Sequence, residues 1–432
     1  MTSKFHLKIK VEERFAVFLS FIYFFCVLAS YYVLRPVRDQ LAVEAGSGQL
    51  PWFFTATFIA TLILTPMFSW LVSKWPRRII LPFAYIVFIV CQMVFVPFFK
   101  DHDLLPLKTL GLIFFVYVSV FNLFVVSVFW SFMADIWDDT QARRLFPIIA
   151  IGGALGAVSG PFVTSVLVQI VELPFLLVLS AILLLTAVVC IALLGNWSQQ
   201  YGSHRFEANN AAAIEGGMLD GLRQILTNPF IGTISIMMVL SDAIGTIAYV
   251  LVTDYSGIAF PKDAVAQTRF AANMDLSANI LQIFLQLTVT RWLLVRYGAG
   301  VVFLTSACIV VFTSLSMGLI DNQYAPILGM MPPVAIVMII TRSLSHGMIL
   351  PARETLYTLV PRSVRYKGKN AVDTVVWRGG DILSVLSVKG LRSLGVTVAG
   401  FGMIWAGLAA IAGYIGYRLA NRVEKGEFKE IA

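Results

Sequence analysis

The sequence predicts an all-α polytopic membrane protein with twelve transmembrane helices in two halves of six. Of its 432 residues, 58% are hydrophobic and only 13% are charged, whereas about a quarter of the residues in a soluble domain are charged. The mean hydropathy of +0.83 comes from repeated apolar runs of about 20 residues, long enough to cross a bilayer. The polar segments between these runs fall in a similar order in both halves of the chain.

Each apolar run is expected to be a helix, because only helices satisfy their own backbone hydrogen bonds in lipid over such lengths. The first run follows Lys4, Lys8, Lys10 and Arg14 without a small-residue cleavage site, and we expect it to be a retained span and not a signal peptide. The expected spans are 15–36, 51–73, 78–99, 108–134, 145–169, 173–195, 229–254, 272–290, 298–320, 325–350, 370–388 and 396–417.

The longest polar stretch divides these spans into two groups of six. We expect an N-terminal six-helix half at 1–195, a cytoplasmic linker at 196–228 and a C-terminal six-helix half at 229–432. The end of the first span, YVLRPVRDQLA at 32–42, aligns with the end of the seventh, YVLVTDYSGIA at 249–259. Secondary transporters are commonly built from such repeats, with the substrate site where the repeats meet.

Lysine and arginine gather in the segments that are cytoplasmic if the N-terminus lies inside. The positive-inside rule therefore places both termini in the cytoplasm. The net charge of +8 is explained by this topology and does not indicate nucleic-acid binding. The four cysteines, which lie in apolar spans without metal-ligand spacing, are expected to be packing residues.

The first span carries charge where a hydrophobic helix is expected to leave the membrane. Tyr31, Arg35 and Arg38 share one helical face, and Asp39 follows them. An ionisable side chain in hydrocarbon costs roughly 2.5–3.5 kcal/mol, so these residues require an explanation. Facing inward, the two guanidinium groups would bind a phosphate or carboxylate through paired hydrogen bonds. Facing outward, they would reach lipid headgroups as membrane-edge anchors.

Two further polar stripes recur at helical spacing. They are Asp242, Thr246, Tyr249 and Thr253 in the seventh span, and Asp275, Asn279, Gln282 and Gln286 in the eighth. They would line an aqueous cavity, with Tyr249 as a substrate-binding candidate. The alternative is hydrogen bonding between helices of the bundle. Asp242 and Asp275 are candidates for proton coupling.

The tenth and eleventh spans also hold charged residues. Arg342 and His346 lie one turn apart, with Arg342 a candidate for substrate binding and His346 for proton relay or for hydrogen-bonded packing. In AVDTVVWRGGDILS, one side would carry Asp373, Trp377, Gly380, Asp381 and Ser384. Arg378 lies three residues before Asp381, which allows a substrate-binding pair or a purely structural ion pair.

Basic residues in two cytoplasmic loops are candidates for gating. They are Arg143 and Arg144 in DDTQARRLFP and Lys367 and Lys369 in RSVRYKGKN, with Asp373 close after the second loop. These cations would attract anions, although the positive-inside rule alone is enough to explain them. In the fifth span, Gly152, Gly156 and Gly160 form a small-residue ridge that predicts close helix packing.

Several stretches resemble known families. The loop SKWPRR at 73–78 resembles the basic loop after the second span of the major facilitator superfamily. LRPVRDQLAV resembles the first-span signature of the ATP/ADP translocase family, the nucleotide transporters of plastids and obligate intracellular bacteria. FWSFMADIWDDTQARRLFPIIAIGGALG at 129–156 and RETLYTLV with RYKGKNAVDTVVWRGGD at 353–381 are similar to two further regions of that family.

This resemblance implies a major-facilitator-type 6+6 bundle that exchanges ATP for ADP, or imports nucleotides, by alternating access. It implies functional roles for the matched positions, which are Arg35, Arg38, Asp39, Lys367, Lys369, Asp373, Arg378 and Asp381. Three positions depart from the family's pattern. Pro36 replaces an aspartate, Gln141 replaces an acidic residue, and Tyr249 stands where the family has a glutamate.

We therefore expect a secondary transporter of an anionic solute, with nucleotides as the leading substrate class and no cofactor. The alternatives are a proton-coupled carrier of another solute, such as a peptide or siderophore, and a lipid flippase. The sequence has no metal cluster, nucleophile elbow or P-loop spacing, which argues against an enzyme. We expect a monomer in the lipid bilayer of a bacterial inner membrane, with a small anionic solute as its partner.

Overall fold

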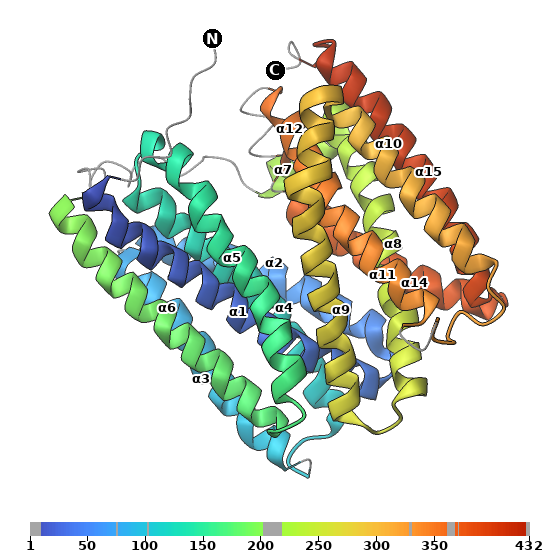
Figure 1. The fold of residues 1–432 in the computed structure, drawn as a ribbon, viewed down its shortest axis with the longest axis horizontal. Helices are drawn as coiled ribbons and strands as arrows, with labels where there is room; N and C mark the ends of the chain where they lie inside the picture. The colour runs from blue at the N-terminus through green and yellow to red at the C-terminus, as the bar shows by residue number, and fades with distance from the viewer. Residues whose placement is uncertain are drawn as a thin grey trace. The chain divides into compact units, whose positions relative to one another are not determined.

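The computed structural model describes residues 10–74, 77–101, 103–201, 218–327, 331–360, 368–369 and 371–428. Side chains are described for these residues except at 69–74, 77–79, 139, 143, 200–201 and 218–222. The basic loop at 73–78 and the candidates Arg143 and Lys367 therefore lie outside the described side chains. Apart from one isolated bridge between Ile327 and Met331, the regular elements of the described residues are helices (Figure 1).

The chain forms two compact units. The first unit contains 1–41, 63–214 and 263–276, and the second contains 42–62, 215–262 and 277–432. Each unit thus includes a short segment from the other predicted half. The predicted boundaries at 195 and 229 stay a prediction.

The first unit is built from the helices that follow the N-terminus. They are η1 (Val11–Glu13), α1 (Arg14–Ala45), α2 (Leu50–Lys74), α3 (Arg77–Lys100), α4 (Leu107–Ile136), α5 (Asp139–Leu167), α6 (Leu173–Tyr201) and the first half of α9 (Ala264–Leu285). The last residues of α1 and the first half of α2 belong to the second unit.

The ridge of three glycines brings α5 directly onto α1. A Cβ atom at Gly152 would lie 2.4 Å from the carbonyl oxygen of Phe21, and one at Gly156 would lie 2.4 Å from that of Phe25. At Gly160 the nearest atom would be the Cβ of Tyr32, at 2.7 Å. The two backbones meet at distances that no larger residue allows, so the predicted packing role of this ridge is confirmed.

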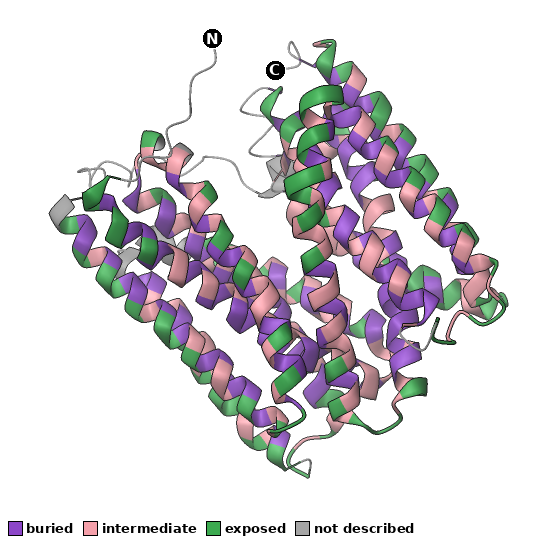
Figure 2. Cartoon of the chain, in the orientation of Figure 1, coloured by how far each residue is buried: buried purple, intermediate pink, exposed green. Residues whose placement is uncertain are grey.

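Helix α6 carries an apolar face that is suited to contact with lipid. Its large exposed apolar residues recur at helical spacing along one face, whereas its buried residues face the protein core (Figure 2). These exposed residues are Phe175, Ile182, Leu185, Val189 and Leu193. A continuous apolar face on a helix of mean hydropathy 3.0 is typical of a membrane-spanning segment.

The second unit contains the remaining helices. They are η2 (Ser47–Gln49), α7 (Met218–Thr227), α8 (Pro229–Ala259), the second half of α9, η5 (Gln286–Thr290), α10 (Arg291–Gly318), α11 (Pro333–Leu344), η6 (Ser345–Ile349), α12 (Leu350–Thr358), η7 (Val372–Val376), α14 (Trp377–Ser393) and α15 (Val398–Glu424). Small residues again permit close packing, here of α15 on α10. A Cβ atom at Gly413 would lie 2.2 Å from the Cβ of Ala307.

Among the described residues of the second unit, three π-helical turns, η5, η6 and η7, interrupt the helices. A π turn holds one residue more than an α turn and occurs frequently at functional sites. Here η6 carries His346, and η7 carries Asp373 immediately before α14. The sequence periodicity, which assumes a regular α-helix, did not predict these turns.

Ten segments of the described residues are long and apolar enough to span a membrane. One of them, Ala264–Gly318, has 55 residues, and it includes a kink at Gly298, where φ is 79°. It covers both the eighth and the ninth predicted spans. The predicted span at 370–388 is not among the ten, because η7 and α14 carry Asp373, Arg378, Asp381 and Lys389.

Candidate functional site

The arginines of the first span lie well inside α1. The helix continues through Pro36 to Ala45, so Arg35 lies ten residues, or about 15 Å, before its end. Arg38 is 8% exposed, and the side chain of Arg35 is 15% exposed. Both guanidinium groups are thus turned to protein neighbours and not to lipid headgroups.

Both arginines have carboxylate partners within the first unit. Nε and Nη2 of Arg38 donate to Oδ1 of Asp39 at 2.9 and 2.6 Å. Nε of Arg35 lies 3.6 Å from Oδ2 of Asp275 on α9 and 3.9 Å from Oδ2 of Asp39. Asp275 is 3% exposed. The structure therefore brings together four predicted site residues, Arg35, Arg38, Asp39 and Asp275, which we call the α1 cluster.

Aromatic rings surround the α1 cluster. The guanidinium of Arg38 lies 4.7 Å from the ring centroid of Phe115 on α4. Tyr32 lies 6.0 Å from the guanidinium of Arg35, and its ring meets that of Tyr31 edge to face. Tyr31 is buried on α1, as its helical spacing with Arg35 predicts. Such rings stabilise cations through their π faces and exclude water from the charges.

A second polar cluster lies inside the second unit, between α8 and α14. Thr246 donates a hydrogen bond of 2.8 Å to Oδ1 of Asp381, and Nη1 of Arg378 lies 3.5 Å from Oδ2 of the same residue. The carboxyl group of Asp242 lies beside the turn of α14 that carries Asp381, since a Cβ atom at Gly380 would be 3.7 Å from its Oδ2 atom. We call Asp242 and Asp381 the carboxyl pair.

Two other predicted site residues have contacts within the second unit. Tyr249 is buried in the second unit against the ring of Phe54, with their centroids 6.2 Å apart. The Nδ1 atom of His346 is 3.2 Å from the carbonyl oxygen of Arg342, and its ring centroid is 6.4 Å from that of Trp377. Trp377 directly precedes Arg378 on α14, so His346 lies near the second polar cluster.

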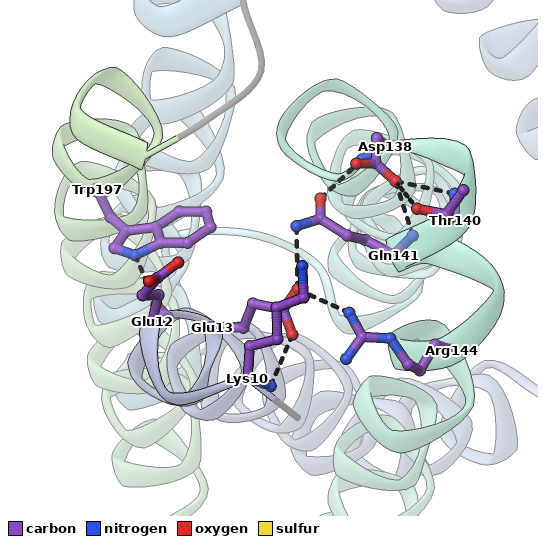
Figure 3. Close-up of polar contacts among 8 residues, drawn as sticks. All are labelled: Lys10, Glu12, Glu13, Asp138, Thr140, Gln141, Arg144 and Trp197. Carbon is purple, nitrogen blue, oxygen red and sulfur yellow. Dashed lines mark hydrogen bonds and ion pairs between the residues drawn. The ribbon is translucent and has the colours of Figure 1, made fainter. Parts of the chain in front are cut away.

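The loop candidate Arg144 is held by a buried acid at the start of α1 (Figure 3). Nη2 of Arg144 donates to Oε1 of Glu13 at 2.7 Å, and Nε2 of Gln141 donates to the same oxygen at 3.1 Å. The backbone N–H of Lys10 donates to the other oxygen of Glu13 at 3.0 Å. Asp138 caps α5 by accepting from the backbone of Thr140 and Gln141, so this end of α5 is firmly positioned.

The loop candidates of the second unit meet in a similar network. Nη1 of Arg353 donates to Asp373 at 2.6 Å, and its Nη2 donates to Glu354 at 2.9 Å. Lys369 also binds Glu354. Asp373 is thus tied to α12, whereas Asp381 faces Thr246 and Asp242. The residues of the predicted single side of the eleventh span thus have different partners, with Asp373 in the π turn η7 and Asp381 in α14.

Sequence reasoning did not single out Glu13, Arg353 or Glu354. Glu13 lies among the charged residues that precede the first span, and nothing in the sequence distinguishes it from the exposed Glu12. Arg353 and Glu354 lie in the quoted stretch RETLYTLV, so the resemblance contained a signal for them. Among the described residues, no group of three or more His, Cys, Asp or Glu side chains is placed to hold a metal ion.

A helical bundle with many spans, lipid-facing apolar surfaces and charged clusters buried between its helices defines a polytopic membrane protein. Residues 17–370 match the family model described as Major Facilitator Superfamily. The chain belongs to this superfamily, whose members are secondary transporters and not enzymes. Its fold is the superfamily's all-helical one.

Sequence relatives are distant but extend over most of the chain. In an alignment of 442 positions that covers 88% of this chain and 69% of the relative, the chain is 21% identical to ADP,ATP carrier protein 1, chloroplastic, of Arabidopsis thaliana. In an alignment of 444 positions that covers 89% of this chain and 83% of the relative, it is 21% identical to ADP,ATP carrier protein 1 of Chlamydia muridarum.

Solved structures share the fold at lower identity. The nucleoside transporter NupG superposes with a TM-score of 0.63 at 15% identity, covering 95% of this chain and 99% of that one. A bacterial homologue of the lysosomal transporter Spinster, in an inward-facing and unoccupied conformation, superposes with a TM-score of 0.60 at 13% identity, covering 97% and 99%.

Proposed function

We propose that this secondary transporter carries an anionic solute, with nucleotides as the leading substrate class, and that Arg35 and Arg38 bind the anion. The observation that carries the proposal is the burial of two guanidinium groups on one face of α1, well inside the helix. Burying one such charge in a membrane costs several kcal/mol, so a pair of them indicates a function.

The chemistry of the pair suits phosphate or carboxylate groups. A guanidinium offers five N–H donors in a planar arrangement that matches two anion oxygens at once. Tyr31 and Tyr32 lie beside the arginines, where a ring of the solute would find apolar surface. The distant similarity to ADP,ATP carriers supports a nucleotide in particular.

The test is uptake of labelled ATP into proteoliposomes that are either preloaded with ADP or left empty. We expect the wild type to accumulate ATP, more strongly when ADP is inside. Arg38→Ala should reduce uptake by about tenfold or more, since each lost charged hydrogen bond is worth roughly 1.5–3 kcal/mol. Arg422→Ala is the matched control, because Arg422 pairs with Glu427 at the exposed end of α15.

Absence of ATP uptake in both conditions would remove ATP as the substrate. Competition with inorganic phosphate, dicarboxylates and sugar phosphates would then identify the anion class. If no anion is bound or transported by the wild type, the assignment of Arg35 and Arg38 as an anion site is wrong.

The carboxyl pair supports a second candidate, a carrier that couples solute movement to protons. Asp242 lies beside the turn of α14 that carries Asp381, and one arginine, Arg378, accompanies these two carboxyl groups. Two adjacent carboxylates in a low-dielectric site do not both ionise readily, so a proton is a suitable third partner. Such a carrier would fit a solute of another class, such as a peptide.

This candidate predicts uptake that follows an imposed pH gradient and ignores ADP inside the vesicle. Asp242→Asn should abolish the response to the gradient. Asp263→Asn is the control, since Asp263 lies in the exposed turn before α9. Uptake that depends on ADP and not on the gradient would exclude the proton-coupled alternative.

A further inference from the structure

We propose that Asp275 is the resident counter-ion of the anion site, and that a transported anion must displace it, so that binding of the anion releases α9 from α1. This inference rests on the proposed function, because it assumes that Arg35 and Arg38 receive an anion. It assigns to Asp275 a role in linking anion binding to helix movement, where the sequence suggested only proton coupling.

The charge balance of the α1 cluster carries the first step. Two guanidinium groups face two carboxylates, so the four charges sum to zero before any solute arrives. Asp275 and Arg38 are buried, and Arg35 and Asp39 nearly so. An anion added here brings uncompensated negative charge into a low-dielectric region. One of the two carboxylates must therefore give up its arginine.

The distances indicate which carboxylate yields. Arg38 makes two hydrogen bonds of normal length to Asp39. Arg35 meets Asp275 with its Nε atom 3.6 Å from Oδ2, which is longer than a normal N–H···O hydrogen bond of 2.7–3.2 Å. The Arg35–Asp275 contact is thus an attraction between charges without a short hydrogen bond, and the anion replaces this contact most easily.

The position of Asp275 links its displacement by the anion to a movement of α9 relative to α1. Asp39 and Arg38 both lie on α1, so the ion pair between them does not itself join two helices. Asp275 lies on α9, one residue before the point where this helix passes from the first unit into the second, between Leu276 and Ser277. Breaking the Arg35–Asp275 contact removes the ionic link that holds this part of α9 to α1.

A neutral contact between the same helices remains when the anion is bound. Nε2 of Gln40 on α1 approaches Oε1 of Gln267 on α9 at 3.5 Å. It carries no net charge, so an anion does not compete for it directly. When the anion leaves, Arg35 regains Asp275 as its partner. An empty carrier is therefore held by the ion pair, which favours exchange of one anion for another over movement of the empty protein.

The experiment compares wild type, Asp275→Asn and Asp39→Asn in proteoliposomes, with labelled ATP outside and ADP or buffer inside. Each variant gives an apparent KM and a ratio of uptake into loaded and empty vesicles. For Asp275→Asn we expect a KM lower by about three- to tenfold, because a competing charge is gone, and a ratio that falls towards one. Asp39→Asn should lower the KM but keep the wild-type ratio.

A second variant covers the case in which Asp275→Asn does not fold. Asp275→Glu keeps the charge and extends the carboxylate towards Arg35, so it should raise the KM and keep the ratio. If wild-type transport is intact but both Asp275 variants match its KM and ratio, the role given to Asp275 is wrong and the proposed function stands. If the wild type neither transports nor binds any anion, the proposed function itself fails, and this inference fails with it.

Discussion

Glu13 and Arg144 lie far apart in the sequence but form a partly buried ion pair, with Nη2 of Arg144 2.7 Å from Oε1 of Glu13. The pair joins the start of α1 to the first turns of α5. Glu13 is 3% exposed and accepts from three groups, which are Arg144, Gln141 and the backbone of Lys10. One carboxylate thus organises this end of the first unit.

Glu13→Ala should destabilise the protein by about 1–3 kcal/mol, because its buried donors lose their acceptor. Thermal unfolding in detergent measures the effect. Glu12→Ala is a matched control, since Glu12 is exposed and the bond it makes to Trp197 uses its backbone carbonyl. Equal melting temperatures for the two variants would contradict the importance of the buried carboxylate.

Gly156→Ala tests the contact of α5 with α1. The new methyl group would meet the carbonyl oxygen of Phe25 at 2.4 Å, so the helices must move apart. We expect a loss of about 1–3 kcal/mol, the usual cost of overpacking. Gly195→Ala on α6 is the control, because no atom lies within 4 Å of the added methyl group there. A stable Gly156→Ala variant would show that the ridge is not tightly packed.

Arg353→Ala should destabilise the second unit by about 1–3 kcal/mol, since it leaves Asp373 and Glu354 without their shared cation. The side chain of Arg353 is only 4% exposed. Arg422→Ala also removes a salt bridge, but one whose partners are nearly half exposed. Such a pair contributes little, so this control should unfold within about 0.5 kcal/mol of wild type. Unfolding free energies in denaturant distinguish the two.

Phe115→Leu tests whether the aromatic face positions Arg38. Leucine keeps most of the apolar contact but lacks the π face, which lies 4.7 Å from the guanidinium. Cation–π contacts are worth roughly 0.5–2 kcal/mol. We expect the KM of the transported anion to rise by about two- to tenfold, with a fall in melting temperature like that of the control below, because both rings are buried. Phe114→Leu, at the neighbouring buried ring, should lower the melting temperature without this change in KM. An unchanged KM in Phe115→Leu would exclude the positioning role.

Much of the architecture was accessible from the sequence, because hydrophobic length and glycine spacing are local properties. Most expected spans coincide with long helices, and the glycine ridge packs as predicted. The eleventh predicted span shows what a hydropathy criterion fails to detect. Its charged residues lower the apolar signal, and their partners on other helices, such as Arg353 and Thr246, cannot be identified from hydropathy alone.

The candidate site was only partly accessible. The helical spacing of Tyr31, Arg35 and Arg38 indicates a common face, and the spacing of Arg378 and Asp381 allows an ion pair. Pairing across the chain was not accessible, since nothing local relates Arg35 to Asp275 or Glu13 to Arg144. Burial of Glu13 likewise depends on contacts with α5, whereas Glu12, with the same side chain, remains exposed.

The π turns η5, η6 and η7 have a consequence for how helices of the second unit can turn. Each accommodates one residue more than an α turn, and returning it to α-helical geometry rotates everything beyond it by about 100°, the angle per residue of an α-helix. Only a few backbone hydrogen bonds change partner in that step. In η7, this conversion would turn Trp377, Arg378 and Asp381 towards a different side of the helix.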